Sequence, residues 1–182
     1  MKDILKMALT LMLITAASAA SLSYVHGLTS DVVALREAEK TRQAISEYFP
    51  AAETVEEETV EGVGFKAVYD EGGVFLGVLA EARARGYAGP IPYQLVIDSQ
   101  GEIKEITYGA NEETVGIGKQ IEEEPFVSQV IGLTPADPIE LNTDIDLVSG
   151  ATESFAGMAR SLRDTMDKFA ARFLDGQEVE GS

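Results

Sequence analysis

The sequence predicts an α+β fold, in which a mainly antiparallel sheet is packed with helices and one N-terminal transmembrane helix comes first. Three features of the 182 residues lead to this prediction. An uncharged apolar run lies near the N-terminus, short β-type runs separated by turn residues follow, and a strongly periodic helical segment lies near the C-terminus. A hydrophobic content of 45% is enough for one domain with a core of its own.

The first segment has the properties of a membrane anchor. No Asp, Glu, Lys or Arg occurs between Lys6 and Asp31. At about 1.5 Å per helical residue, this run can span a hydrocarbon core of roughly 30 Å. We therefore predict residues 1–30 to be a retained anchor, with Lys2 and Lys6 in the cytoplasm and the rest of the chain outside. A cleaved signal peptide with its cleavage site at Ala17–Ala19 is the alternative.

Residues 31–182 are predicted to form one extracytoplasmic domain that begins with a helical stalk. The segment Asp31–Phe49 has a helical pattern with charges of alternating sign, and Pro50 ends it. Five glutamates then crowd the segment Glu53–Glu61, which is typical of a solvated loop or of the edge of a sheet.

Four β-type runs predict the sheet. The first two are separated by Asp70-Glu71-Gly72-Gly73 and the last two by Asp98-Ser99-Gln100-Gly101, and both separators are hairpin signals. A loop rich in glycine and proline, Arg85–Pro92, precedes the third run. The four runs are Phe65–Tyr69, Val74–Ala80, Tyr93–Ile97 and Ile103–Tyr108.

The remainder of the chain is predicted to be mainly helical. Lys119–Leu133 has the pattern of a short helix interrupted near Pro125, and Pro135–Leu147 is predicted to be a loop with a short extended piece. In the last helix, apolar residues recur at spacings of three or four and predict one buried stripe. These residues are Phe155, Met158, Leu162, Met166, Phe169 and Phe173.

Composition excludes several classes of function. The 31 acidic and 14 basic side chains give a formal net charge of −17, and such a surface repels nucleic acid. The chain has no cysteine, which rules out disulfides, thiolate zinc sites and Cys-ligated clusters. The single histidine, His26, has no second histidine to pair with, so we predict no metal site.

The start of the last helix has the properties of a phosphate site. Ser149, Gly150, Ala151 and Thr152 lead into it, and small residues allow a tight turn there. A helix N-terminus offers unpaired N–H groups and a positive dipole end, and both favour a phosphate. Ser and Thr are also the ordinary caps of helices, so a cap without a ligand is the alternative.

Two further loops contain glycines that allow a close approach of backbone to a ligand. The first, Gly86–Ile91, reads GYAGPI and contains Tyr87. The second, Glu113–Gly118, reads ETVGIG and follows the fourth β-type run. Turn residues alone would explain either loop without a ligand.

Together the three motifs resemble the flavin-binding domain of the G subunit of Rnf complexes and of the C subunit of the sodium-pumping NADH:quinone oxidoreductase. That family has SGAT-x-S/T, GY-x-G-x-I and ETPGLG elements in these places, and a single N-terminal membrane helix. Here Val115 replaces the usual Pro and Ile117 the usual Leu, so a looser loop is expected.

The resemblance implies FMN bound covalently, through a phosphoester, to the last Thr of SGAT. In this sequence that residue is Thr152. The resemblance implies no catalytic acid, base or nucleophile. It implies further cofactor-binding residues from all three motifs: Ser149, Gly150, Ala151, Glu113, Thr114, Gly116, Ile117, Gly118 and Tyr87.

The implied function is that of an electron-relay subunit in a membrane-bound Rnf-type ion-translocating complex. Its partners would be the other membrane subunits, including one that carries flavin in the membrane, and a flavin transferase that attaches the FMN. Three alternatives remain open: a stand-alone extracytoplasmic flavin carrier, the C subunit of a sodium-pumping quinone reductase, and a scaffold domain without a cofactor.

Overall fold

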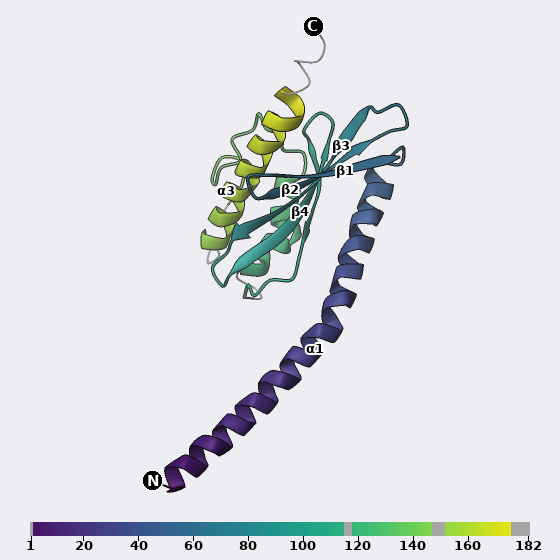
Figure 1. The fold of residues 1–182 in the computed structure, drawn as a ribbon. Coiled ribbons are helices and arrows are strands. Elements are labelled where there is room, and N and C mark those ends of the chain that lie inside the picture. The colour runs from purple at the N-terminus through teal and green to yellow at the C-terminus, as the bar shows by residue number, and fades with distance from the viewer. Residues whose placement is uncertain (1, 115–117, 147–151, 176–182) are drawn as a thin grey trace. The chain divides into compact units, whose positions relative to one another are not determined.

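The computed structural model describes residues 2–114, 118–146 and 152–175 (Figure 1). The chain divides into two compact units, Met1–Gln43 and Ala44–Ser182. The first unit is helical, and the second contains a sheet with helices, as the predicted α+β class requires.

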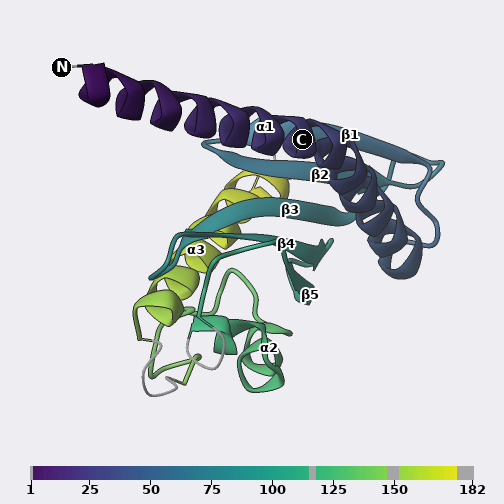
Figure 2. The same ribbon diagram turned by 90° about the horizontal axis from the view of Figure 1, so that it is seen from below.

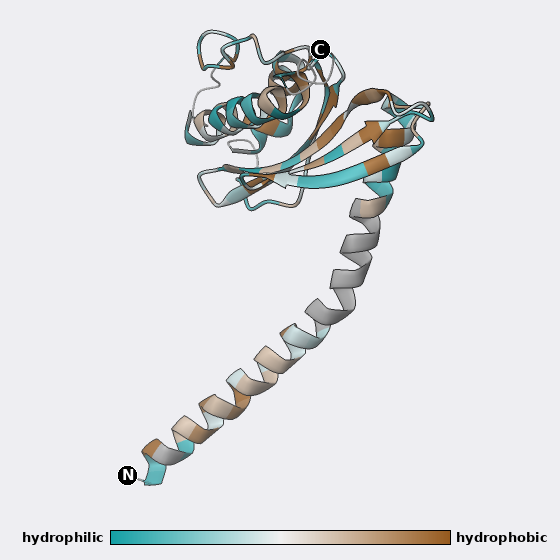
Figure 3. Ribbon diagram, turned by 45° about the horizontal axis from the view of Figure 1, so that its top comes forward, coloured by the Kyte–Doolittle hydropathy of each residue, from teal (hydrophilic) through white to brown (hydrophobic). Residues whose placement is uncertain are grey.

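Helix α1 (Lys2–Tyr48) makes up the first unit and continues into the second. Its 23 residues Lys2–Tyr24 are long and apolar enough to cross a membrane (Figure 3). At about 1.5 Å per residue this segment measures about 35 Å. Its large apolar side chains are exposed, Ile4 by 69% and Leu22 by 73%. An N-terminal signal sequence has the same properties, so the anchor and the signal peptide both remain compatible with this helix.

Within the described residues, five strands form one antiparallel sheet in the order β1-β2-β3-β4-β5 (Figure 2). Each strand therefore pairs with its neighbours in the sequence, as hairpin connections dictate. The predicted loop Arg85–Pro92 is shorter than expected, because both flanking strands extend into it. The strands are β1 (Thr54–Val60), β2 (Val63–Tyr69), β3 (Phe75–Arg85), β4 (Pro90–Asp98) and β5 (Ile103–Tyr108).

The glutamate-rich segment is an edge strand. We expected a solvated loop or an edge here, and β1 pairs with β2 alone, from Thr54 opposite Tyr69 to Val60 opposite Val63. Its residues are mostly exposed and show little apolar alternation. The periodicity of this segment does not predict a strand. Its pairing with the buried strand β2 makes it one.

Helix α3 (Thr152–Phe169) covers one face of the sheet and continues into η2 (Ala170–Leu174), a short π-helix (Figures 1 and 2). The predicted stripe is confirmed, since all of its members from Phe155 to Phe173 are buried. They pack on the strand residues of one parity, such as Phe65, Ala80 and Leu95. The polar side of α3 faces outward (Figure 3).

The opposite face of the sheet has a smaller core. Ala44 at the end of α1 and Phe49 pack there with strand residues of the other parity, Val68, Leu79 and Val96. Both faces are thus covered where consecutive residues are buried, at Val78–Ala80 of β3 and Leu95–Ile97 of β4.

Two short helices follow β5. They are η1 (Gly118–Glu122), a 3-10 helix, and α2 (Glu124–Val130). Pro125 lies in the first turn of α2, where a missing N–H costs nothing, so the interruption predicted near this proline is confirmed. Phe126 of α2 contacts Phe155 of α3 edge to face, with ring centroids 4.9 Å apart.

Candidate functional site

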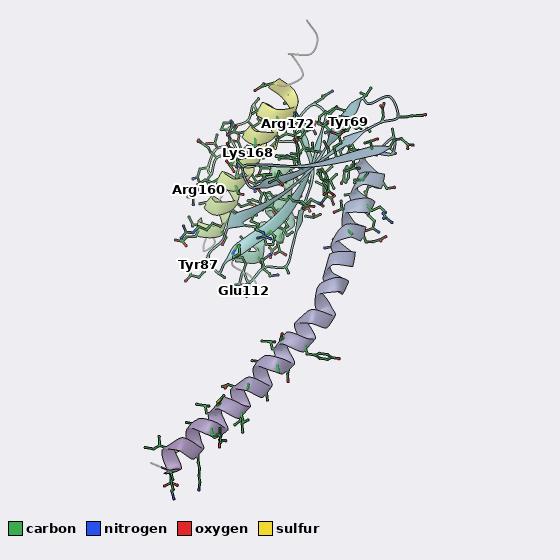
Figure 4. All side chains as sticks on the ribbon, viewed as in Figure 1. Tyr69, Tyr87, Glu112, Arg160, Lys168 and Arg172 are labelled. Carbon is green, nitrogen blue, oxygen red and sulfur yellow. The ribbon has the colours of Figure 1, made fainter. Side chains whose placement is uncertain are left out.

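The loop Gly86–Gly89 joins β3 to β4 and lies at the end of the domain where α3 begins (Figure 4). Its ends are closed by a hydrogen bond from Gly86 N–H to the Gly89 carbonyl, 2.9 Å. The Tyr87 side chain points away from the domain and is 76% exposed. Tyr87 and Ala88 turn their N–H groups to partners far along the chain, so distant residues shape this loop.

Glu113 lies at the centre of the site. Its side chain is buried, and each carboxylate oxygen accepts one hydrogen bond. Ala88 N–H donates to Oε1 at 2.9 Å, and the Ser154 hydroxyl donates to Oε2 at 2.8 Å. One residue of the second motif therefore links the loop of the first motif to the helix of the third.

The start of α3 is held close to the end of β3. Ser154, which is buried, also accepts a hydrogen bond from Tyr87 N–H at 3.3 Å. A Cβ on Gly157 would lie 1.8 Å from the Arg85 carbonyl oxygen, so only glycine permits this approach of helix to strand. Thr152, the first residue of α3, is exposed. Its position is thus fixed by its neighbours while its side chain stays accessible.

The second motif is closed at its base by the residues that flank it. Asn111 donates from Nδ2 to Glu122 Oε1 at 2.8 Å, and its Oδ1 accepts from Glu113 N–H at 3.2 Å. Lys119 N–H donates to the Thr114 carbonyl at 3.1 Å. A Cβ on Gly118 would lie 1.7 Å from Glu113 Oε2. These contacts bring the two ends of the motif close together.

Five predicted site residues lie in the described part of the chain: Tyr87, Glu113, Thr114, Gly118 and Thr152. Backbone or side-chain contacts connect the three motifs to which they belong. The Glu113 side chain is buried in the protein. The other predicted residues, Ser149, Gly150, Ala151, Gly116 and Ile117, lie outside the described residues.

A line of hydroxyl groups on the inner side of α3 was not predicted from the sequence. Ser154 and Thr165 are buried and Ser161 is partly buried, and their helical spacing beside the apolar stripe could have revealed them. The Tyr93 hydroxyl of β4 lies 2.9 Å from both Ser161 Oγ and Thr165 Oγ1. Burial raises the pKa of Tyr93, and the two hydroxyl contacts offset part of that rise. This network connects α3 to the centre of the sheet.

An open groove of about 720 Å³ runs along the same helix. One wall is the segment Pro138–Leu141, and the other is formed by α3 residues that include Ala156 and Arg160. Arg163 of α3 connects the helix to the segment just before the Pro138–Leu141 wall, because its guanidinium donates to the carbonyls of Pro135 and Asp137. The groove therefore has a rigid border on the side of the loop.

The chemistry available at this site is that of binding. Among the described residues, no three His, Cys, Asp or Glu side chains are grouped so that they could hold a metal ion. The site combines an exposed threonine at a helix start, close backbone approaches and a buried carboxylate whose two oxygens are both engaged. Such an arrangement can hold a phosphorylated ligand at the helix start.

Comparison with known proteins agrees with the motif-based resemblance. Residues 86–167 match the family model described as FMN-binding domain. The G subunit of the ion-translocating oxidoreductase complex of Methanosarcina acetivorans is 28% identical over 185 residues, covering 94% of this chain and 97% of that protein. The resemblance predicted from the three motifs is thus confirmed.

Two solved structures share the fold. The structure of NqrC from Shewanella oneidensis matches this chain with a TM-score of 0.52 and 19% sequence identity. The match covers 72% of this chain and 74% of the NqrC chain. The C subunit of the Na(+)-translocating NADH-quinone reductase of Parabacteroides distasonis gives 0.50 at 17% identity, with 71% and 81% covered.

Proposed function

We propose, from the similarity of residues 86–167 to FMN-binding domains, that this chain carries FMN on Thr152 and relays electrons within an Rnf-type ion-translocating complex. The similarity to a G subunit along 94% of the chain favours this complex over a quinone reductase. The observation that supports the site most is the connection of all three motifs through Glu113 and Ser154.

The residues at the start of α3 suit a phosphate that is held covalently. Thr152 is exposed at the first position of an 18-residue helix, where N–H groups have no partner within the helix. Glu153 in the first turn and the net charge of −17 oppose a free phosphate. A phosphoester at Thr152 would retain the ligand against this repulsion.

FMN, when bound, supplies one-electron chemistry, and the chain positions it. We assign Thr152 to the phosphate, with Ser149, Gly150 and Ala151 forming the turn before it. Tyr87, Thr114 and the Gly116–Gly118 segment are assigned to the flavin ring. The chain itself then needs no catalytic acid or base.

We further propose that residues 1–30 remain as an anchor and that the domain lies outside the cytoplasm. The partners are then the other membrane subunits, one of them a flavin carrier within the membrane. A flavin transferase would attach the FMN from an activated flavin nucleotide, in which a phosphoanhydride bond breaks as the bond from Thr152 Oγ to phosphorus forms. The length and apolar composition of Lys2–Tyr24 support the anchor.

The attachment is tested by replacing Thr152 with Ala in full-length protein co-produced with a flavin transferase. In-gel fluorescence and intact mass should reveal covalent flavin in the wild type and none in the variant. Thr59→Ala, an exposed threonine of β1, is the matched control and should keep its flavin. Fluorescence that persists in Thr152→Ala would place the bond elsewhere.

The topology is tested on the same membranes. Because the chain has no cysteine, a single Cys introduced at Glu57 reports its side of the membrane. An impermeant maleimide should label it in intact cells, and N-terminal sequencing should begin at the first residues. A mature N-terminus near Ala20 would instead establish a cleaved signal peptide. Co-purification with integral membrane subunits would distinguish a complex from a stand-alone carrier.

A further inference from the structure

Among the acidic side chains that the structure describes, Glu113 alone is buried, with 5% of its surface exposed. The chain has a formal net charge of −17. All of its other acidic side chains that the structure describes are at least partly exposed to solvent. A buried carboxylate is costly unless hydrogen bonds compensate for the lost water. Its position therefore needs an explanation beyond composition.

Both oxygens of this carboxylate are engaged by segments distant in the sequence. Ala88 N–H, 25 residues away, donates to Oε1, and the Ser154 hydroxyl, 41 residues away, donates to Oε2. In both contacts the carboxylate oxygen is the acceptor. Neither contact lies in a strand ladder or in the hydrogen bonds of a helix, so this side chain supplies a connection that the secondary structure lacks.

The surroundings leave room for this carboxylate and for little else. A Cβ at Gly86 would lie 2.2 Å from Oε1, and a Cβ at Gly118 would lie 1.7 Å from Oε2. Real atoms cannot approach so closely, so glycine at both positions makes space for the Glu113 side chain. Two glycines of two different motifs thus have the same steric function.

We propose that Glu113 is a positioning residue for the flavin: it fastens the Gly86–Gly89 loop to the start of α3 and so fixes Thr152 relative to that loop. This role rests on the proposed function. Glu113 acts through Ala88 and Ser154, whose donors its two oxygens accept.

The first test needs no flavin. Full-length protein made without a transferase is compared by amide hydrogen exchange with Glu113→Ala and with Glu112→Ala, the exposed neighbour. Removing the buried acceptor should accelerate exchange at Ala88 by about tenfold or more, while the Glu112 variant exchanges like the wild type. Unchanged exchange at Ala88 in Glu113→Ala would overturn the fastening role.

The second test uses the flavin-loaded protein. Glu113→Ala should lower the yield of covalent flavin and shift its absorbance and midpoint potential. Glu113→Gln, whose amide can accept from Ala88 and donate to Ser154, should restore most of the yield and the spectrum. Glu112→Ala should again match the wild type in all three measurements.

The outcomes separate the two proposals. If the wild type carries no flavin, the proposed function and the positioning role both fall. If the wild type carries flavin and Glu113→Ala has the same yield, spectrum and potential, the positioning role alone is overturned. Should Glu113→Ala not fold, Gly118→Ala displaces the carboxylate and should change the same quantities. An unchanged spectrum and potential in that variant would equally contradict the proposal.

Discussion

Three turns of the sheet are closed in two different ways. The β2–β3 and β4–β5 turns are each closed by an aspartate of their own, since Asp70 Oδ1 accepts from the N–H groups of Gly72 and Val74 at 2.8 Å. Asp98 does the same for Gln100 and Glu102 at 2.9 and 3.0 Å. The β3–β4 loop instead takes its side-chain partners from Glu113 and Ser154.

This difference distinguishes the turns that belong to the scaffold of the sheet from the loop that belongs to the candidate site. A turn closed by its own aspartate can form as soon as its hairpin does. The loop Gly86–Gly89 closes its ends with its own backbone, but its side-chain partners come from the second and third motifs. Changes near Glu113 or α3 should therefore alter the flavin site, whereas changes in the self-contained turns should alter stability alone.

The largest expected effect comes from separating α3 from the end of β3. In Gly157→Ala the new methyl group would lie 1.8 Å from the Arg85 carbonyl oxygen, and backbone cannot yield cheaply. We expect the free energy of unfolding to fall by about 3 kcal/mol, with loss of covalent flavin. Urea denaturation and in-gel fluorescence measure the two effects.

Gly89→Ala is the control for this variant, because among the described residues, its chain neighbours aside, no atom lies within 4 Å of the position that its methyl group would take. Gly89 belongs to the loop that follows β3, and its replacement should leave both stability and flavin nearly unchanged. Equal losses in the two variants would mean that any change in this region is harmful, and that the approach of helix to strand is not special.

A smaller effect is expected from Ser154→Ala. This change deprives Glu113 Oε2 of its donor and Tyr87 N–H of its acceptor, which should lower the free energy of unfolding by about 2 kcal/mol. The flavin spectrum should shift as well. Ser128→Ala on α2, an exposed serine, is the matched control. A stable variant with an altered spectrum would still support the distant origin of the loop's shape, whereas an unaltered spectrum would argue against it.

A self-contained turn should respond differently. Asp70→Ala removes the acceptor for Gly72 and Val74 and should cost about 1 kcal/mol of stability. Flavin yield, spectrum and potential should stay as in the wild type, because no contact of this turn reaches the site among the described residues. A changed potential in Asp70→Ala would remove the distinction between the two kinds of turn.

The smallest effect concerns pH. Partial burial by itself would raise the pKa of Asp98, but the N–H groups of Glu102 and Gln100 and the Lys104 ammonium outweigh it and lower the pKa below its ordinary 3.8. Since the folded pKa is the lower one, the stabilisation is present above pH 3.8 and is lost as the pH falls through the folded value. Urea midpoints between about pH 6 and about pH 2.5 should therefore fall less steeply in Asp98→Asn. Parallel curves would be evidence against this contribution.

The sequence allowed prediction of those parts of the fold that depend on local signals. Both hairpin turns with their leading aspartates, the stripe of α3 and the break near Pro125 follow from spacing and turn chemistry over a few residues. The strand β1 lacks such a signal, because Glu56, Glu57 and Glu58 interrupt any apolar alternation. Its pairing partner, and not its own sequence, makes it a strand.

The candidate site was accessible only through the resemblance. The three motifs predict where the site lies, but no spacing in the sequence indicates that Glu113 meets Ala88 and Ser154. The exclusion of a Cβ at Gly86 and Gly118 likewise arises in the folded domain, where residues far apart in the chain come into contact. The line of hydroxyl groups on α3, in contrast, could have been predicted from its helical spacing.

The acidic edge strand has a consequence for how copies of this protein meet. An unpaired strand offers a template on which another chain can add, at a spacing of about 4.8 Å. On β1, however, three consecutive glutamates would face the same charges of a second copy across that distance. Arg172 neutralises Glu58, with its Nε 3.0 Å from Oε2, while Glu56 and Glu57 remain exposed. The charge on this strand therefore opposes the addition of a second copy at the β1 edge.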